Sequence, residues 1–219
     1  MIDSLAHLNY VIVEGPIGVG KTTLATRLAD HLGADTLLEA PDENPFLERF
    51  YAEGQTMALP TQLYFLFQRV RQFNDLKQGD LFRPRLVADF MVQKDPLFAQ
   101  ITLDKDELWL YEQVYNNVTL EAPTPDLVIY LQASIDTLLQ RIEKRSRGEE
   151  SAIDTAYLQQ LCEAYADFFH YYDDAPLLIV NADGLNLADS DEDFELLMQR
   201  VVEAGSGKHY FNPAPFSLA

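Results

Sequence analysis

The sequence has 219 residues, of which 47% are hydrophobic and 23% charged, so it is long enough to bury the core of a globular domain. Its net charge of −19 argues against a surface that binds nucleic acid or an anionic membrane. The sequence shows no signal-peptide pattern and no apolar stretch of the roughly 18 residues that span a membrane, and Cys162 is its one cysteine. We therefore expect a cytoplasmic protein with no internal disulfide.

Short apolar stretches alternate with amphipathic ones along the whole chain. The expected strands are 10–13, 36–39, 85–90, 127–131 and 177–180. The expected helices are 21–32, 44–51, 62–78, 104–121, 135–145, 156–172 and 190–203. This alternation predicts an α/β fold, a five-stranded parallel sheet with helices on both faces. We expect one domain over residues 1–204 and a loosely held C-terminal tail over 205–219, which carries Gly and Pro.

The first expected strand and helix enclose GPIGVGKTT, residues 15–23, which fits the pattern G-x-x-x-x-G-K-[ST]. Glycines let successive backbone N–H groups surround a phosphate, and the start of the helix adds positive charge. Lys21 can reach the β- and γ-phosphates, and the Thr22 hydroxyl can ligate Mg²⁺. Motif and context together disfavour a chance glycine-rich turn, and a dinucleotide-binding loop leaves the lysine unexplained. The residues expected to bind ATP here are Gly15, Gly18, Gly20, Lys21, Thr22 and Thr23.

Two carboxylates stand at the ends of the second and third expected strands. In a doubly wound parallel sheet, ligands gather beyond the carboxyl ends of the strands. Glu39 can accept a proton from an attacking hydroxyl there, or it can cap the turn before Pro41. Asp89, in VADF, can hold Mg²⁺ directly or through water, with a turn-capping role as the alternative. Both interpretations of Glu39 stay open, and the strand-end position of Asp89 favours the metal.

Two polar side chains interrupt the apolar face of the expected helix 62–78. Gln62 and Arg69 are seven residues apart, so they share that face with Leu66 and Phe73. Polar groups on an apolar face need partners. The hydrogen-bonding edge of a ligand base is one possible partner, but spacing alone favours an internal salt bridge.

Basic residues cluster at the end of the expected helix 135–145, although the chain as a whole is acidic. A basic helix end that leads to Gly148 is typical of a mobile lid, here about residues 145–152, whose arginines clamp phosphates and exclude water. A solvated charged helix end is the alternative, and the density of arginines favours the lid. The cluster consists of Arg141, Lys144, Arg145 and Arg147.

Several longer stretches resemble the deoxynucleoside kinase family, most closely its bacterial deoxyguanosine and deoxyadenosine kinases. They are EGPIGVGKTTLA, LLEAPDENPFLERFY, TQLYFLFQRVRQF, VADFMVQKDPLFA, PDLVIYLQAS, LLQRIEKRSRGEES and LLIVNADG. The phosphate loop is generic, whereas ENPFLERFY, QLYFLFQR and RIEKRSRGEE are much more specific. The match runs from Tyr10 to about Glu203. It implies a P-loop kinase with an arginine-bearing lid, which phosphorylates the 5′-hydroxyl of a 2′-deoxynucleoside with ATP.

For the chemistry, the resemblance implies a general base at Glu39 and a partner of Mg²⁺ at Asp89, in addition to Thr22. We expect in-line phosphoryl transfer in which Glu39 takes the proton of the 5′-hydroxyl. Lys21, Mg²⁺ and the lid arginines neutralise charge on the phosphoryl oxygens. The arginines that match those of the family's lid are Arg141, Arg145 and Arg147.

For the substrate, the resemblance implies contacts to both the sugar and the base. Tyr51 and the second lid glutamate, Glu150, match residues that hold the 3′-hydroxyl of the sugar. The Arg69–Asp95 pair suits a base with mixed donors and acceptors, so thymidine is the least expected substrate. The residues that match those of the base site are Gln62, Arg69 and Asp95.

One triplet departs from the family's pattern. Many members carry Asp/Glu-Arg-Ser where this chain has Asp89-Phe90-Met91, and the arginine helps to place the catalytic acid. Phe90 cannot do that, so the means by which Glu39 is oriented is an open question. Some bacterial deoxyguanosine kinases similarly have an aromatic residue at this position, which favours deoxyguanosine.

Two other functions compete with this one. A nucleoside monophosphate kinase shares the loop and the lid but needs more cations for its acceptor, and acidic residues crowd 42–48, with Arg49 as the possible exception. A nucleotide-gated regulator would bind ATP without turning over a small acceptor.

The resemblance also implies a homodimer, formed through helices such as 62–73 or 104–121.

Overall fold

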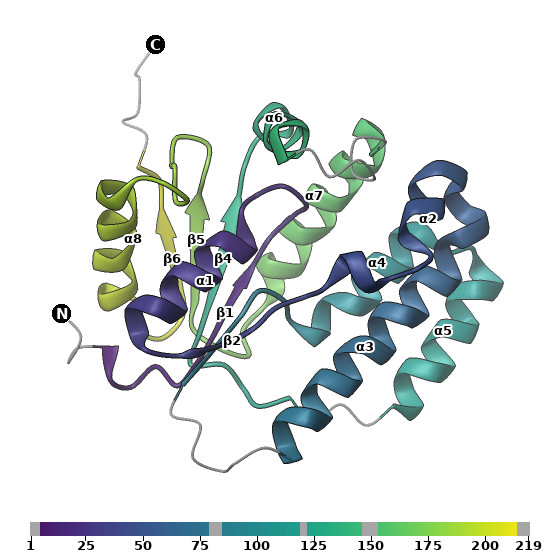
Figure 1. Cartoon of the computed structure of the whole chain (residues 1–219), viewed down its shortest axis with the longest axis horizontal. Coiled ribbons are helices and arrows are strands. Elements are labelled where there is room, and N and C mark those ends of the chain that lie inside the picture. Colours follow the sequence, from purple (N-terminus) through teal and green to yellow (C-terminus); the bar gives the residue numbers. More distant parts are fainter. Residues whose placement is uncertain (1–4, 79–84, 119–121, 146–152, 214–219) are drawn as a thin grey trace.

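Strands from all parts of the chain form one parallel sheet in the order β2-β3-β1-β4-β5-β6 (Figure 1). The computed structural model describes residues 5–78, 85–118, 122–145 and 153–213. The strands are β1 (Tyr10–Glu14), β2 (Asp35–Leu37), β3 (Leu86–Ala88), β4 (Leu127–Gln132), β5 (Leu177–Asn181) and β6 (Lys208–Phe211). The helices are α1 (Lys21–Leu32), α2 (Leu47–Glu53), α3 (Ala58–Gln78), α4 (Asp95–Thr102), α5 (Lys105–Asn117), α6 (Ile135–Arg145), α7 (Thr155–Tyr171) and α8 (Asp191–Glu203). Short 3-10 turns are η2 (Pro41–Glu43), η3 (Gly54–Met57) and η4 (Val92–Lys94).

The α/β architecture predicted from the alternating pattern is confirmed, but the predicted number of five strands was wrong. The sixth strand, β6, comes from the segment expected to be a loose tail and pairs with β5, Leu177 opposite Lys208. Its four residues carry one buried side chain, Phe211, so the apolar pattern that reveals an inner strand is missing. An edge strand needs hydrogen bonds on one side only, which a short polar segment can make.

Helices cover both faces of the sheet because side chains alternate along each strand. On β1, Val11 and Val13 pack into a core with α1 and α8, whereas Tyr10 and Ile12 pack into a core with α4 and α7. A third apolar cluster joins α3, α4 and α5 beside the sheet. In Figure 1 these three helices stand next to one another, away from α1 and α8.

The helix predictions hold best where end signals are local. Helices α1 and α6 have the predicted bounds. Helix α3 begins four residues before the predicted start, because Pro60 lies in its first turn, where proline is tolerated. Helix α4 was not predicted at all, since its eight residues follow directly after η4 and carry too few turns to show a pattern. The end of the expected helix 104–121 lies outside the described residues.

Candidate active site

The loop 15–20 joins β1 to α1 at the point where the order of the strands reverses, since β3 lies on one side of β1 and β4 on the other. A Cβ atom on Gly15 would lie 2.4 Å from the carbonyl oxygen of Leu131, so the loop packs tightly against β4. Lys21 Nζ donates to the carbonyl oxygens of Gly15 (2.8 Å) and Pro16 (3.2 Å), which holds its charge over the loop. The loop glycines with positive φ, which other residues rarely adopt, are Gly15, Gly18 and Gly20.

Glu39 and Asp89 lie together at the carboxyl edge of the sheet. Asp89 Oδ1 accepts the backbone N–H of Glu39 at 2.7 Å, and Asp89 Oδ2 accepts the Thr22 hydroxyl at 2.5 Å. A hydroxyl and a carboxylate are oxygen ligands of the kind that Mg²⁺ takes together with substrate phosphates and water, so Thr22 and Asp89 fit the ion. Among the described residues, no group of three or more His, Cys, Asp or Glu side chains is placed to hold a metal without such phosphates.

The charges around Glu39 keep it ionised. Burial acts to raise the pKa of Glu39, but the positive charges of Lys94, Arg69 and Lys21 lower it to about 2. Burial raises the pKa of Asp89, although the hydrogen bonds that it accepts oppose the rise. Burial and the nearby charge of Lys94 lower the pKa of Lys21. At neutral pH Glu39 is therefore a carboxylate that can accept a proton.

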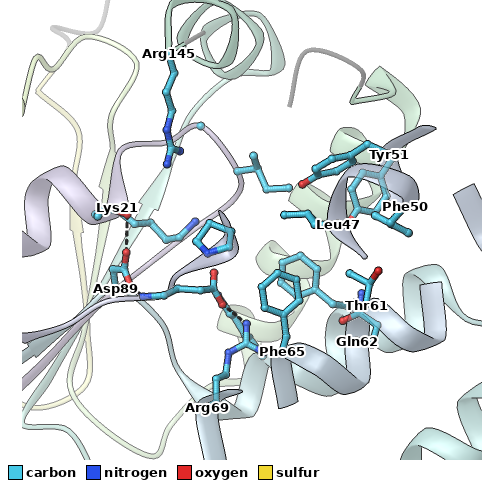
Figure 2. A pocket seen from close by; sticks show the side chains of 18 residues that line it. Lys21, Leu47, Phe50, Tyr51, Thr61, Gln62, Phe65, Arg69, Asp89 and Arg145 are labelled. Atoms are coloured by element: carbon cyan, nitrogen blue, oxygen red, sulfur yellow. Dashed lines mark hydrogen bonds and ion pairs between the residues drawn. The ribbon is translucent and has the colours of Figure 1, made fainter. Parts of the chain in front are cut away.

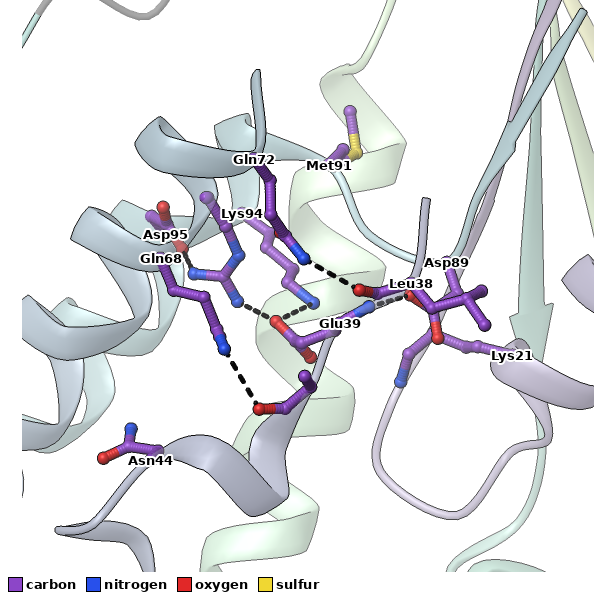
Figure 3. Close-up of polar contacts among 12 residues, drawn as sticks. Lys21, Leu38, Glu39, Asn44, Gln68, Gln72, Asp89, Met91, Lys94 and Asp95 are labelled. Carbon is purple, nitrogen blue, oxygen red and sulfur yellow. Dashed lines mark hydrogen bonds and ion pairs between the residues drawn. The ribbon is translucent and has the colours of Figure 1, made fainter. Parts of the chain in front are cut away.

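Two glutamines of α3 hold the backbone around Glu39 (Figure 3). Gln72 Nε2 donates to the carbonyl oxygen of Leu38 at 2.9 Å, and Gln68 Nε2 donates to that of Ala40 at 3.1 Å. Neither glutamine stands out in the sequence, although their spacing of four residues places them on one side of the helix. Helix α3 thus fixes the segment that carries the expected base.

Arg69 connects this segment to α4. Its buried guanidinium forms ion pairs with Glu39 Oε1 and with Asp95 Oδ1, so the internal salt bridge favoured by spacing is present. Arg69 Nε and Asp95 Oδ2 are buried without a hydrogen-bond partner in the described part of the chain. Arg69 lines a cavity, and Asp95 stands behind it. Of the two residues, Arg69 can therefore offer a donor to a ligand in that cavity.

That cavity lies between the phosphate loop and the helices α2, α3, α4 and α7 (Figure 2). Tyr51 and Gln62 lie at its end remote from Lys21 and Asp89. Gln62 Nε2 donates to Thr102 Oγ1 at 3.3 Å. Apolar walls with a few polar groups at the ends suit a ligand that combines a flat ring with hydroxyl groups. The apolar and aromatic wall residues include Leu47, Phe50, Phe65, Phe98 and Tyr157.

A second cavity lies on the other side of the phosphate loop, beneath α6 and residues 185–189. It also includes Lys144 and Thr23. Figure 2 shows Arg145 reaching toward the first cavity from the side opposite to Arg69. The two cavities meet at the loop, so a group bound in one can pass to a group bound in the other. The residues that line both cavities are Gly18, Lys21, Thr22 and Arg145.

Arg141 has a different environment from Arg145. Its guanidinium donates to the carbonyl oxygens of Val19 (3.0 Å), Ala182 (2.7 Å) and Leu185 (3.0 Å), which ties α6 to the phosphate loop and to the turn after β5. A contact of Arg141 with phosphate stays a prediction. Three other predicted features, Arg147, Glu150 and residues 146–152 of the lid, lie outside the described residues.

Comparison with known proteins agrees with this arrangement of two cavities around a phosphate loop. A model of the family described as "Deoxynucleoside kinase" matches residues 11–204. The chain belongs to the deoxynucleoside kinase family. It is 35% identical to the deoxyguanosine kinase of Bacillus subtilis, over 89% of this chain and 96% of that protein. It is 30% identical to the deoxyadenosine kinase of Lactobacillus acidophilus, over 82% and 88%.

A solved structure resembles this deoxynucleoside kinase over most of its length. It is the deoxyadenosine kinase from M. mycoides with bound dATP, with a TM-score of 0.75, 30% sequence identity, and 89% of this chain and 99% of that chain covered. The fold and family implied by the motifs are thereby confirmed, and the protein is a phosphotransferase that phosphorylates a deoxynucleoside with ATP. Within the described ranges, no helix is long and apolar enough to cross a membrane.

Proposed function

We propose that this kinase prefers a purine deoxynucleoside, deoxyguanosine or deoxyadenosine, and uses the cavity beside α3 for it and the cavity beneath α6 for ATP. The observation that carries this assignment is the meeting of the two cavities at Lys21 and Thr22, with Glu39 on the side of α3. The names of the similar bacterial kinases support a purine. Arg69 lines the cavity, and its buried Nε has no hydrogen-bond partner in the described part of the chain, which supports a base that offers an acceptor.

Glu39 acts as the general base of the reaction. The low pKa of Glu39 means that it accepts the proton late, as the 5′-oxygen bonds to phosphorus and its hydroxyl becomes acidic. Lys21 and Arg145 approach the meeting point of the cavities from two sides and stabilise the negative phosphoryl oxygens. Thr22 and Asp89 would hold Mg²⁺, which would neutralise negative charge on the phosphates of ATP.

The remote end of the cavity beside α3 selects the substrate. Tyr51 contacts the 3′-hydroxyl of the sugar, and the base lies between aromatic walls that include Phe98. Gln62 and Arg69 hydrogen-bond the edge of the base, with Asp95 holding Arg69 in place.

ADP production from Mg·ATP should be measured with each of the four deoxynucleosides, and with dTMP and dGMP. We expect the highest kcat/KM with deoxyguanosine or deoxyadenosine. Equal or higher turnover with thymidine or deoxycytidine would contradict the purine preference. Turnover with a monophosphate alone would contradict the assignment of the acceptor. Tight ATP binding with no turnover of any acceptor would support the regulator described above.

Of the cations that line the acceptor cavity among the described residues, Arg69 and Lys94 already pair with Glu39, which disfavours the monophosphate kinase alternative. Arg49, the possible exception in the sequence, pairs with Glu53 at 3.3 Å and lines neither cavity. The acceptor cavity instead places Glu39 near the phosphate loop, where a second phosphate would be repelled.

The kinase forms a homodimer in this proposal, through α3 and α5. Both helices leave large apolar side chains exposed: Phe67 on α3, and Trp109 and Leu110 on α5. Light scattering after gel filtration measures the mass directly. We expect twice the mass of the chain for the wild type and a shift toward the monomer for Trp109→Glu, whereas a monomeric wild type would contradict the dimer.

A further inference from the structure

Phe90 stands where many members of the family have an arginine that helps to place the catalytic acid. Glu39 therefore lacks that arginine in this kinase. Phe90 is fully buried and packs edge-to-face on Phe73, with ring centroids 6.0 Å apart, in the core beneath α3 and α7. It offers no hydrogen bond and no charge to a carboxylate. Another side chain must therefore orient Glu39 in this kinase.

Lys94 lies where such a side chain is needed. It ends the turn η4, four residues after Phe90, and its side chain is 3% exposed. Lys94 Nζ is 3.5 Å from Glu39 Oε1 and 3.3 Å from Glu14 Oε1. Figure 3 shows the Lys94 side chain directed at the Glu39 carboxylate. A buried ammonium group is costly unless it is paired, so its position between two carboxylates is well defined.

Glu14 supplies a rigid anchor for Lys94. Its carboxylate is fully buried and accepts hydrogen bonds from the backbone N–H groups of Gly15 and Met91 and from the Tyr165 hydroxyl, each at 2.9 Å. These donors come from the phosphate loop, the segment after β3 and α7. Because Glu14 cannot move without breaking these bonds, it fixes the ammonium group of Lys94 relative to the phosphate loop.

Arg69 and Lys94 both contact Glu39, but their other contacts differ. Arg69 also pairs with Asp95, which we assign to base recognition, so its orientation depends on the substrate. Lys94 instead pairs with Glu14 and Glu39, and its ammonium group lies over the face of Phe98, 5.6 Å from the ring centroid. Among the described residues, both cations lie on Oε1 of Glu39, which leaves Oε2 to accept the proton of the 5′-hydroxyl.

From these contacts we propose that Lys94, anchored by Glu14, is the positioning residue for the Glu39 carboxylate and takes the part that the missing arginine plays elsewhere in the family. The inference rests on the proposed role of Glu39 as general base. Lys94 itself does not exchange a proton with the substrate. It holds one carboxylate oxygen so that the other faces the cavity.

The first test compares Lys94→Met with the conservative variant Lys94→Arg. As a matched control, Lys105→Met removes a positive charge from an exposed position on α5. We expect Lys94→Met to lower kcat about 100-fold while the KM for ATP changes less than about twofold, as for loss of one preorganised charge. Lys94→Arg should recover most of kcat, and Lys105→Met should match the wild type. Lys94→Met with a kcat near that of the wild type would overturn the inference.

The second test places Lys94→Met in a Glu39→Gln background. If Lys94 acts through the carboxylate, the substitution lowers kcat less than about threefold further once that carboxylate is gone. An equal loss in both backgrounds would overturn the inference and assign Lys94 to folding or to the phosphates. Glu39→Gln with normal kcat would instead refute the general base, which is a separate failure. Should Lys94→Met not fold, Lys94→Gln keeps a donor for Glu14, and the same outcomes apply.

Discussion

The phosphate loop and the acceptor cavity are assembled in opposite ways. The loop is nine consecutive residues, 15–23, and in our proposal its backbone N–H groups bind the phosphates of ATP. The acceptor cavity draws on α2, α3, η4, α4 and α7. Its side chains Lys94, Glu39 and Arg69 belong to a chain of alternating charge that continues to Glu14 at one end and to Asp95 at the other. Phosphate recognition is thus a local property, whereas acceptor activation depends on partners that are far apart in the sequence.

This contrast predicts different consequences of substitution on the two sides. On the loop, a change that adds a side chain acts through backbone strain and reduces stability. In the acceptor cavity, a change that removes a charge leaves its partner buried and uncompensated, and also removes a group from the reaction. The following experiments test that distinction, in order of expected effect.

Glu39→Gln tests the proposed general base in the acceptor cavity. We expect kcat to fall about 10²–10⁴-fold, because the general base is lost, while the Kd for ATP changes less than about threefold. Steady-state kinetics and ATP titration measure the two quantities. Glu48→Gln, an exposed change of the same kind on α2, is the control and should retain full activity. A common loss of ATP binding and kcat would show that the two sides are not separable.

Arg69→Met tests the chain of charges. It leaves Glu39 and Asp95 without their shared cation, so we expect the free energy of unfolding to fall by about 3–5 kcal/mol and the KM for the deoxynucleoside to rise. Denaturant unfolding and kinetics provide the measurements. The exposed Arg71→Met on the same helix should change stability by less than about 0.5 kcal/mol. Equal stability of the two variants would refute the buried ion pairs.

Gly15→Ala tests the loop. Its φ is +151° and the added Cβ would meet a carbonyl oxygen at 2.4 Å, so we expect a loss of about 2–3 kcal/mol in the free energy of unfolding. Gly184→Ala is the control, because nothing lies within 4 Å of its added Cβ. Thermal unfolding of both variants makes the comparison. If Gly15→Ala is as stable as Gly184→Ala, the loop is not constrained as the structure shows.

Asp183→Asn has the smallest expected effect. Burial acts to raise the pKa of Asp183, but hydrogen bonds from Ser134 and Thr137 and the charge of Arg141 lower it overall. A carboxylate with a lowered pKa stabilises the fold above its usual pKa of about 3.9, and that stability is lost as the pH falls through the lowered value. At pH 7 we expect the Tm of the variant to lie about 2 °C below that of the wild type.

Acid should remove the difference between the two proteins. As the pH falls from 5, Asp183 binds its proton first in the unfolded chain and only at a lower pH in the folded protein, so the difference in Tm between the wild type and Asp183→Asn should shrink. Scanning calorimetry at several pH values follows this convergence. A difference in Tm that stays constant down to pH 3 would mean that the charge of Asp183 contributes no stability.

The features that could be predicted from the sequence are those that depend on residues close together in the chain. The bounds of α1 follow from the glycines on either side of it, Gly20 and Gly33, both left-handed in the structure. The predicted strands 36–39 and 85–90 are longer than β2 and β3, which end at Leu37 and Ala88, but the carboxylates Glu39 and Asp89 do follow directly after these apolar stretches. These features could be predicted because parallel sheets bring the ends of their strands to one edge whatever the remaining contacts are.

Other features could not be predicted from the sequence. Lys94 looks like an ordinary charged residue in VADFMVQKDPLFA, and only its burial between Glu14 and Glu39 distinguishes it. Gln68 and Gln72 hold the backbone of residues 38–40 only because that segment passes beside α3 in the folded protein. Arg141 and Arg145 are four residues apart, yet one donates to backbone carbonyls and the other lines both cavities.

The sequence by itself determined the phosphate loop, the α/β alternation and the family, because these depend on backbone freedom and on periodicities within a few residues. The tertiary structure alone decided the edge strand β6, the anchoring of Lys94 by Glu14 and the division of Arg69 between two carboxylates. The physical reason is that a buried charge is stable only beside its partner, and these partners lie tens of residues away along the chain.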